Sequence, residues 1–294
     1  MDALLEAIRR HADAHPAGNP VATAIPGLNT VCATAPSALM HDVLRPMVCL
    51  VRQGAKRVTM GARDYEFGAG DSLLITADVP TTSRITRADA AAPYYSLALE
   101  LDPAILADLV AQMGPPPAAD HAPVRVDPTE ADVLDAALRL MKPLDRPASI
   151  PVLGAQLVRE LHYWLLVGRH GDAIRRLGWP GGHVHRIARA VRLMRRDFAR
   201  PLPVERLAAE SGMSPSTFHQ HFKRVTSLSP LQFQKRLRLV EARRLMHAQG
   251  ASASSAAYAV GYESVPQFTR EYGRMFGAPP VADLRAADRQ RAIP

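Results

Sequence analysis

A stretch of about twenty residues occurs twice in the last third of the chain. The first copy reads GMSPSTFHQHFKRVTSLSP over 212–230, and the second reads GYESVPQFTREYGRMFGAPP over 261–280. The aromatic pairs are Phe218 and Phe222 in the first copy and Phe268 and Tyr272 in the second. Because residues four positions apart lie on the same side of a helix, each copy is expected to bury its aromatic side. The repeat therefore predicts two similar helical units.

Each copy begins like a helix that follows a tight turn. Ser214 suits an N-cap and Pro215 suits the first helical position, while the preceding VERLAAESGMS predicts a helix and a turn at Gly212. SAAYAVGYES repeats this plan, with a turn at Gly261 and an N-cap at Ser264. A helix, a glycine turn and a capped helix are typical of a helix-turn-helix motif. The two motifs are expected at about 203–226 and about 253–276.

Polar side chains occupy the side of each capped helix that lies opposite the aromatic pair. The N-terminal half of such a helix can read base edges in a major groove, and cations further along can hold phosphates. The predicted base-reading residues are Ser216, His219 and Gln220 in the first copy, and Pro266, Gln267 and Arg270 in the second. The predicted phosphate-binding residues are Thr217, Lys223, Arg224 and Arg274. A solvated amphipathic helix would also have a polar side. Because the same polar side occurs in both copies, we favour double-stranded DNA as the partner.

Positive charge is concentrated in the same part of the chain. Residues 183–294 contain 19 Lys and Arg against 8 Asp and Glu, whereas residues 1–182 contain 17 against 20. All of the net charge of +8 therefore comes from the last third, which again favours nucleic acid. Between the copies, PLQFQKRLRLVEARRLMHAQG predicts one long helix. Two units joined in this way can place their capped helices roughly 34 Å apart, in successive major grooves.

The first half of the chain is predicted to be rich in β-strands. Short β-rich runs alternate with turn residues over about 44–101, a spacing typical of a small antiparallel barrel or sandwich. Asp102 starts a helix after the last run. A later helical stripe, made of Leu157, Leu161, Trp164 and Leu165, either covers the barrel or forms a dimer face. GWPGG at 178–182 indicates a domain boundary.

At these residues the chain resembles the AraC/XylS family of bacterial transcription regulators. LAAESGMSPSTFHQHFKRVTSLSP, RLRLVEARRLM and VGYESVPQFTREYGRMFGAPP are similar to the family's double helix-turn-helix domain, over about 183–285. VCLVRQGAKRVTMGARDYEFGAGDSLLITADVPTTSRITRADAAAPYYSLALELDPA is similar to its N-terminal sensor domain, a cupin-like barrel. One departure is Ser227, where the family usually has glycine, and a left-handed backbone there would carry a small strain cost.

The resemblance implies a cytoplasmic, sequence-specific DNA-binding regulator of transcription. Its implied partners are double-stranded DNA, RNA polymerase and a small-molecule effector in the barrel. An activator is expected, although the sequence leaves open repression, the identity of the effector, the target genes and a homodimer.

The predicted fold class is α+β with two domains. A small antiparallel, cupin-like β-barrel with flanking helices precedes an all-α double helix-turn-helix domain. The sensor and dimerisation domain is expected over 1–177, with the barrel at about 25–101 and helices at 102–177. The DNA-binding domain is expected over 183–286, followed by a tail at 287–294.

No catalytic residue, metal site or cofactor is predicted. The barrel region has no histidine between His41 and His121, whereas metal-binding cupins use a set of His and Glu ligands. Two cysteines and the lack of a long apolar run favour a soluble cytosolic protein with no membrane partner. The alternatives to a regulator are an enzyme with an appended DNA-binding domain and an architectural DNA-binding protein without an effector.

Three residues of the barrel region are candidate sensor positions: Cys49, Arg52 and Asp78. Cys49 is either a buried core thiol or an electrophile or redox sensor, since a basic neighbour such as Arg52 would favour its thiolate. Asp78 either contacts a ligand or holds a turn. Gly54 is expected in a solvated hairpin.

Overall fold

The computed structural model describes residues 2–15, 20–61, 63–115 and 123–291. The chain divides into two compact units. Met1–Met40 and Leu44–His185 form the first unit, and His41–Val43 and Arg186–Pro294 form the second. The two-domain α+β prediction is confirmed: the first unit combines antiparallel sheets with helices, and the described elements of the second unit from α6 onward are helices.

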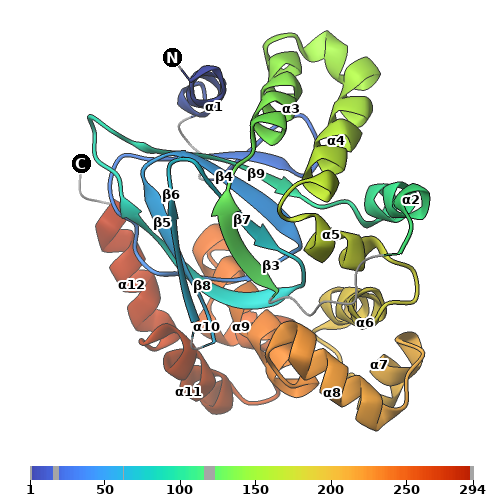
Figure 1. Cartoon of the computed structure of the whole chain (residues 1–294). Coiled ribbons are helices and arrows are strands. Elements are labelled where there is room, and N and C mark those ends of the chain that lie inside the picture. The colour runs from blue at the N-terminus through green and yellow to red at the C-terminus, as the bar shows by residue number, and fades with distance from the viewer. Residues whose placement is uncertain (1, 16–19, 62, 116–122, 292–294) are drawn as a thin grey trace. The chain divides into compact units, whose positions relative to one another are not determined.

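The strands form two antiparallel sheets, and apart from the middle of β3 they belong to the first unit (Figure 1). Six strands lie in the order β1-β2-β9-β4-β7-β10, and four lie in the order β3-β8-β5-β6. The bounds are β1 Val21–Ala22, β2 Leu28–Ala33, β3 Met40–Leu44, β4 Met47–Gln53, β5 Ala55–Met60, β6 Arg63–Gly68, β7 Asp71–Ile75, β8 Val79–Arg87, β9 Tyr94–Glu100 and β10 Val124–Pro128. Within the described residues the predicted barrel is thus two separate sheets rather than one closed sheet.

Gly54 is the corner at which the chain passes from one sheet to the other. It lies between β4, which pairs with β7 and β9, and β5, which pairs with β6 and β8. The expected hairpin at Gly54 is therefore wrong. The φ of Gly54 is +80°, and a Cβ there would lie 2.5 Å from the carbonyl oxygen of Arg87, so a side chain cannot be accommodated.

Helices cover one face of the six-stranded sheet (Figure 1). These are α1 Ala3–Asp13, α2 Pro103–Met113, α3 Ala131–Met141, α4 Ile150–Val167 and α5 Gly171–Gly178, with short 3-10 turns at Lys142–Asp145 and Pro147–Ser149. Leu161 and Leu165 of α4 are buried in one core with Val48 and Leu50 of β4. The side of α4 that carries Leu161 therefore covers the sheet, which is the first of the two predicted alternatives.

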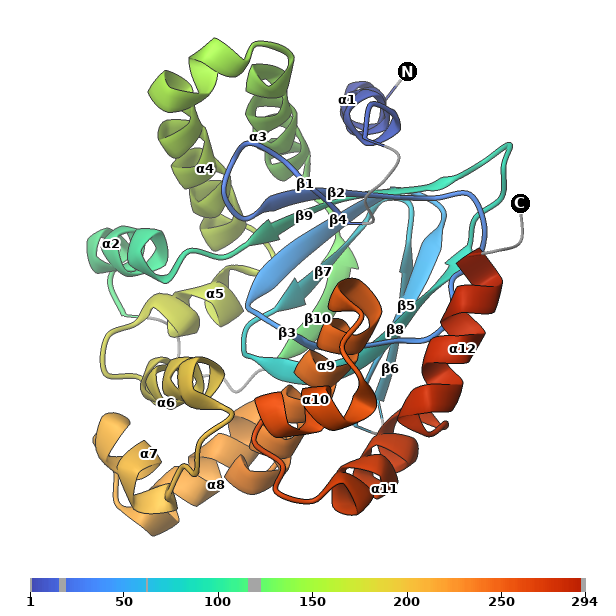
Figure 2. The same cartoon turned by 180° about the vertical axis from the view of Figure 1, so that it is seen from behind.

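The second unit consists of helices packed around α9 (Figure 2). They are α6 His183–Asp197, α7 Val204–Glu210, α8 Pro215–Thr226, α9 Pro230–Gln249, α10 Ala253–Ala259, α11 Val265–Phe276 and α12 Pro280–Arg291. Residues 287–291, expected in a tail, continue α12 because no Pro or Gly interrupts the helix after Pro280. Residues 292–294 lie outside the described part.

The repeat in the sequence is a repeat in the structure. α11 begins fifty residues after α8, and α12 begins fifty residues after α9. Each helix-turn-helix motif has its own hydrophobic core. Phe218 and Phe222 lie in one core with Phe233 of α9, and Phe268 and Tyr272 lie in the other. The linking helix contributes to both cores, so the two motifs are held on one element.

Candidate nucleic-acid interface

Both capped helices begin by the same chemistry. The backbone N–H of Thr217 donates to Ser214 Oγ at 3.3 Å, and the N–H of Gln267 donates to Ser264 Oγ at 3.4 Å. A proline follows in the first turn of each helix. These interactions fix where α8 and α11 start and hence which side chains lie in their first turns.

The aromatic pairs determine which side of each helix faces outward. Phe218, Phe222, Phe268 and Tyr272 are all 0% exposed. The ring centroids of the first pair are 5.3 Å apart and those of the second are 5.5 Å apart. With one side of each helix fully buried, the opposite side of α8 and of α11 is accessible along its length.

Most of the predicted DNA-contacting residues lie on these accessible sides. Ser216, His219, Gln220, Lys223 and Arg224 of α8 are exposed, as are Pro266, Arg270 and Arg274 of α11. Thr217 and Gln267 are half-buried, and Ser214 Oγ donates to the Thr217 hydroxyl at 2.9 Å. This exposure is compatible with DNA contact, and the individual roles stay predictions.

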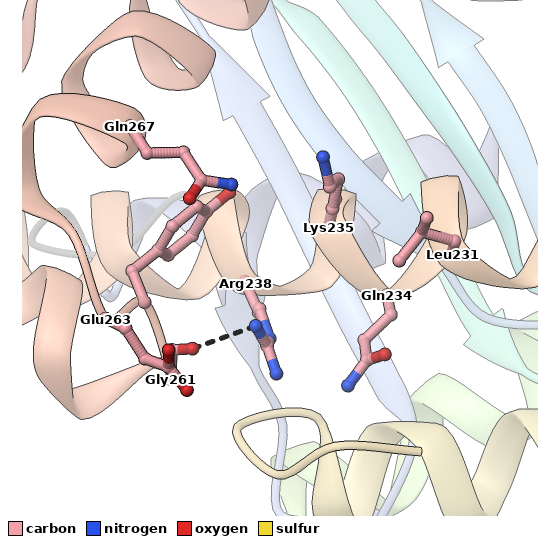
Figure 3. A pocket seen from close by; sticks show the side chains of 8 residues that line it. Leu231, Gln234, Lys235, Arg238, Gly261, Glu263 and Gln267 are labelled. Carbon is pink, nitrogen blue, oxygen red and sulfur yellow. Dashed lines mark hydrogen bonds between the residues drawn. The ribbon is translucent and has the colours of Figure 1, made fainter. Parts of the chain in front are cut away.

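Arg238 of α9 ties the second motif to the loop before the first. Its guanidinium donates to the carbonyl oxygens of Phe198 at 2.8 Å and Ala199 at 3.2 Å. It also donates to the carbonyl oxygen of Gly261 at 2.9 Å, the hydrogen bond drawn in Figure 3. Gly261 has a φ of +86°, and a Cβ there would lie 1.9 Å from the Ala199 carbonyl oxygen. The close approach therefore requires glycine, and one fork of N–H donors holds both segments against α9.

A polar pocket of about 170 Å³ lies beside this clamp (Figure 3). It is lined by Leu231, Gln234, Lys235, Arg238, Gly261, Tyr262, Glu263 and Gln267. The Gln234 amide in its wall donates to the carbonyl oxygens of Phe198 at 2.9 Å and Arg200 at 2.7 Å. A predicted base-reading residue, Gln267, thus borders a pocket that the linking helix helps to form.

Glu271 is the centre of a hydrogen-bond network that sequence reasoning missed. It accepts from Lys235 Nζ at 2.8 Å, from the Tyr262 hydroxyl at 2.8 Å and from the Gln267 amide at 3.1 Å. Burial alone would raise the pKa of the Glu271 carboxyl, but these donors outweigh burial and lower the pKa. The one available signal was an acidic residue between Arg270 and Arg274 in an otherwise basic helix.

Asp283 fixes α12 in a similar way. Arg243 of α9 donates to both of its oxygens, at 2.9 and 3.1 Å. The Tyr272 hydroxyl donates at 2.7 Å, and His247 Nε2 lies 2.9 Å away. Burial would raise the pKa of Asp283, yet the hydrogen bonds from Tyr272, His247 and Arg243 lower it. Three helices are thereby joined through one carboxylate.

The candidate sensor residues of the first unit are Cys49 and Arg52 of β4 and Asp78 before β8. Cys49 is buried on β4, and Arg52 pairs with Asp2, the N-cap of α1. Asp78 is buried immediately before β8. The sensor roles of Cys49, Arg52 and Asp78 therefore stay predictions, with the Arg52 charge already compensated by a carboxylate.

Two hydroxyl groups of β9, those of Tyr94 and Ser96, are buried with incomplete hydrogen bonding. Tyr94 and Ser96 are 0% exposed, and in the described part of the chain neither hydroxyl oxygen makes a hydrogen bond of good geometry, the groups near enough to interact with Tyr94 being Ser96 and the Cys49 thiol. They alternate with Tyr95 and Leu97, which pack against the helices, so they lie on the opposite face of the sheet. Burial and the neighbouring Cys49 thiol raise the pKa of Tyr94.

The described residues contain neither a metal-binding cluster nor a membrane-spanning helix. No group of three or more His, Cys, Asp or Glu that could hold a metal ion occurs among them. Among the same residues, no helix is long and apolar enough to cross a membrane.

Comparisons with known proteins cover both units. Residues 24–173 match the family model of the AraC-type transcriptional regulator N-terminus, and residues 207–286 match a helix-turn-helix domain. The chain is 28% identical to the HTH-type transcriptional regulator GbdR of Pseudomonas aeruginosa over 34% of this chain and 27% of that one. It is 32% identical to the HTH-type transcriptional activator RhaS of Escherichia coli over 30% of this chain and 31% of that one. The chain thus spans less than a third of the length of these relatives.

Solved structures of ToxT from Vibrio cholerae share the fold. An apo form of a ToxT variant has a TM-score of 0.60 at 11% identity, covering 90% of this chain and 98% of that one. Wild-type ToxT described as bound to an unsaturated fatty acid has a TM-score of 0.54 at 10% identity, over 87% and 94% of the two chains.

Proposed function

The chain belongs to the AraC-type transcriptional regulators, and on this premise we propose that it reads a DNA site with α8 in one major groove and α11 in the next. One observation carries the proposal: two capped helices, fifty residues apart, bury identical aromatic positions and expose polar sides. The linking helix α9 contributes to the core of each motif, so both can act on one duplex. The roles of the ten predicted contact residues are part of this proposal.

Selection of bound sites from random duplexes tests it. We expect a site with two preferred blocks about 10 base pairs apart, centre to centre. Gln220→Ala should relax the preference at one position of one block and Arg270→Ala at one position of the other, because each side chain lies on a different helix. An architectural DNA-binding protein would instead give no preferred sequence, and a single block would exclude the use of both helices.

We also propose that the first unit binds a small-molecule effector. The buried hydroxyls of Tyr94 and Ser96 support this, since among the described residues they have only each other and the Cys49 thiol to interact with, and incompletely bonded buried polar groups are rare unless they serve a ligand or a water. The ToxT structure described as fatty-acid-bound has a related fold and suggests amphipathic molecules as the first class to test.

Thermal unfolding of the full chain with a panel of small amphipathic molecules tests the effector proposal. A molecule that raises the unfolding temperature should do so less in Tyr94→Phe, which keeps the ring and removes the hydroxyl. An unchanged shift in Tyr94→Phe would exclude this hydroxyl. Cys49→Ser distinguishes a sensor thiol from a core thiol, since a core role leaves effector-dependent transcription unchanged.

We propose activation through RNA polymerase, in the cytoplasm, by a protein with no catalytic activity of its own. The similarity to RhaS, an activator, favours this direction over repression. A reporter placed behind the selected site should rise in expression with the protein, and sedimentation at equilibrium decides between a monomer and a homodimer.

A further inference from the structure

We propose that Glu271 is a specificity-determining positioning residue. It holds the Gln267 amide so that the amide carbonyl oxygen is presented to the DNA and selects a base with an exocyclic amino group. The inference rests on the proposed DNA-reading role of α11, and it assigns the kind of base that this helix prefers.

The orientation of the amide follows from the chemistry of its neighbours. Gln267 and Glu271 are four residues apart and lie on the same side of α11, with the amide nitrogen 3.1 Å from Glu271 Oε1. An ionised carboxylate only accepts hydrogen bonds, so the amide must turn its NH₂ group toward Glu271. Its carbonyl oxygen then points away from Glu271 and keeps its capacity to accept.

Glu271 is itself held by groups from two other segments. Lys235 of α9 shares Oε1, and Tyr262, in the turn before α11, donates to Oε2. The Glu271 side chain is only 17% exposed, and its lowered pKa keeps it ionised at neutral pH. The carboxylate therefore cannot move away from the Gln267 amide without breaking bonds to α9 and to the turn.

A Gln267 carbonyl oxygen presented to the DNA would discriminate among bases in the major groove. Adenine N6 and cytosine N4 donate there, whereas guanine O6 and thymine O4 accept. A fixed acceptor pairs with adenine or cytosine and faces an unpaired acceptor at guanine or thymine. The second N–H of the Gln267 amide remains available, which favours adenine further because adenine N7 accepts beside N6.

The first motif lacks this device. Thr217 and His221 stand at the positions that correspond to Gln267 and Glu271, fifty residues earlier. The Thr217 hydroxyl is engaged with the N-cap Ser214 instead of with a carboxylate four residues on. The orientation of a base-reading amide by a buried acid is thus a property of α11 and not of the repeat.

Binding to duplexes that differ at one base tests the inference. The relevant position is the one at which Gln267→Ala reduces discrimination, and the wild type should prefer adenine or cytosine there. Glu271→Gln keeps the size of the side chain but can both donate and accept, so the Gln267 amide is free to turn. We expect discrimination at that position to fall by about tenfold. Preferences at the other positions should be retained.

Two controls separate positioning from structure and charge. Glu241→Gln removes the same charge from the surface of α9, where Glu241 pairs with Arg244, and should leave discrimination unchanged. In a Gln267→Ala background, Glu271→Gln should have no further effect on discrimination, because the amide that it orients is gone.

The outcomes also separate this inference from the proposed function. If Glu271→Gln weakens all duplexes equally, or acts equally without Gln267, Glu271 is merely structural and the inference is wrong. If the wild type shows no base preference at any position, the DNA-reading proposal itself fails.

Discussion

Ser227 is a single residue whose backbone the repeat makes easy to interpret. It ends α8 with a φ of +63°, and it is the one non-glycine residue with a positive φ in the described part of the chain. Gly277 ends α11 at the corresponding position with a φ of +79°. The two helices thus end with the same left-handed C-cap, formed by Gly277 in α11 and by Ser227 in α8. The backbone of Ser227 is strained in this conformation, as the sequence resemblance led us to expect.

Ser227→Gly should therefore stabilise the second unit. The free energy gained by relieving the left-handed strain exceeds the entropic cost of ordering a glycine on folding. We therefore expect the free energy of unfolding to rise by up to about 1 kcal/mol. Denaturation in urea measures this. Gly277→Ser is the matched control and should lower the free energy of unfolding by a similar amount, since no atom lies within 4 Å of a Cβ there. A destabilised Ser227→Gly would show that the serine hydroxyl matters more than the backbone.

Lys223 allows a test of phosphate binding at the same scale. It is exposed in the last turn of α8, beyond the residues expected to read bases. Lys223→Ala should weaken binding to all duplexes similarly and reduce the slope of log affinity against log salt by about one. Salt titrations on a selected and a random duplex measure both effects. A loss confined to one base position would assign Lys223 to base reading instead.

At the scale of elements, α9 joins the two helix-turn-helix motifs of the second unit and α12. It contributes to both aromatic cores, carries the Arg238 clamp, and holds α12 through Arg243 and Asp283. A helix between the motifs was predictable from the apolar spacing. Its polar contacts were not, because a guanidinium that binds backbone carbonyls leaves no pattern in the sequence of its partners.

Arg238→Met tests the clamp. The substitution keeps much of the stem and removes every Arg238 donor, so four carbonyl oxygens lose a charged partner, those of Phe198, Ala199, Arg200 and Gly261. We expect the free energy of unfolding to fall by roughly 2–3 kcal/mol. Arg244→Met, which removes an exposed pair with Glu241 on the same helix, should cost less than about 1 kcal/mol. Equal costs for the two variants would mean that the clamp adds nothing.

A buried histidine of α4 gives the first unit a predictable pH dependence. His162 is 0% exposed, its Nε2 accepts from the Asp102 N–H at 2.9 Å, and its Nδ1 donates to the Val158 carbonyl oxygen at 2.8 Å. Burial lowers the pKa of His162, and it lowers the pKa of His170 as well. Since the folded state resists the proton that the unfolded chain takes up, stability should decrease as pH falls below about 6.5.

His162→Gln should make that dependence shallower. The comparison is between slopes of unfolding free energy against pH from 7.5 to 5, because the substitution also changes stability at every pH. The residual slope comes from other buried histidines such as His170 and, toward pH 5, from carboxylates with lowered pKa values such as Glu271. A slope identical to that of the wild type would show that His162 does not titrate between the folded and unfolded states.

At the scale of the whole molecule, the sequence predicted most of the C-terminal unit and less of the N-terminal one. The starts of α8 and α11 follow local cap chemistry at Ser214 and Ser264, and aromatic residues four apart fix the buried side, so short-range rules suffice. The arrangement of the two sheets depends on strand pairing between residues far apart in the sequence. The sequence around Gly54 predicts a hairpin because the change from one sheet to the other leaves no local pattern. The Glu271 network joins α9, a turn and α11, a convergence that no local pattern encodes.

The central claim is that both motifs, held on α9, read one site in successive major grooves. Inserting five base pairs between the two selected blocks turns one block to the opposite face of the duplex while keeping every base. The measurement is the affinity of the full chain for the original and the lengthened site. We expect the lengthened site to bind about as weakly as a duplex with one block alone. Undiminished affinity for the lengthened site would contradict simultaneous reading by α8 and α11.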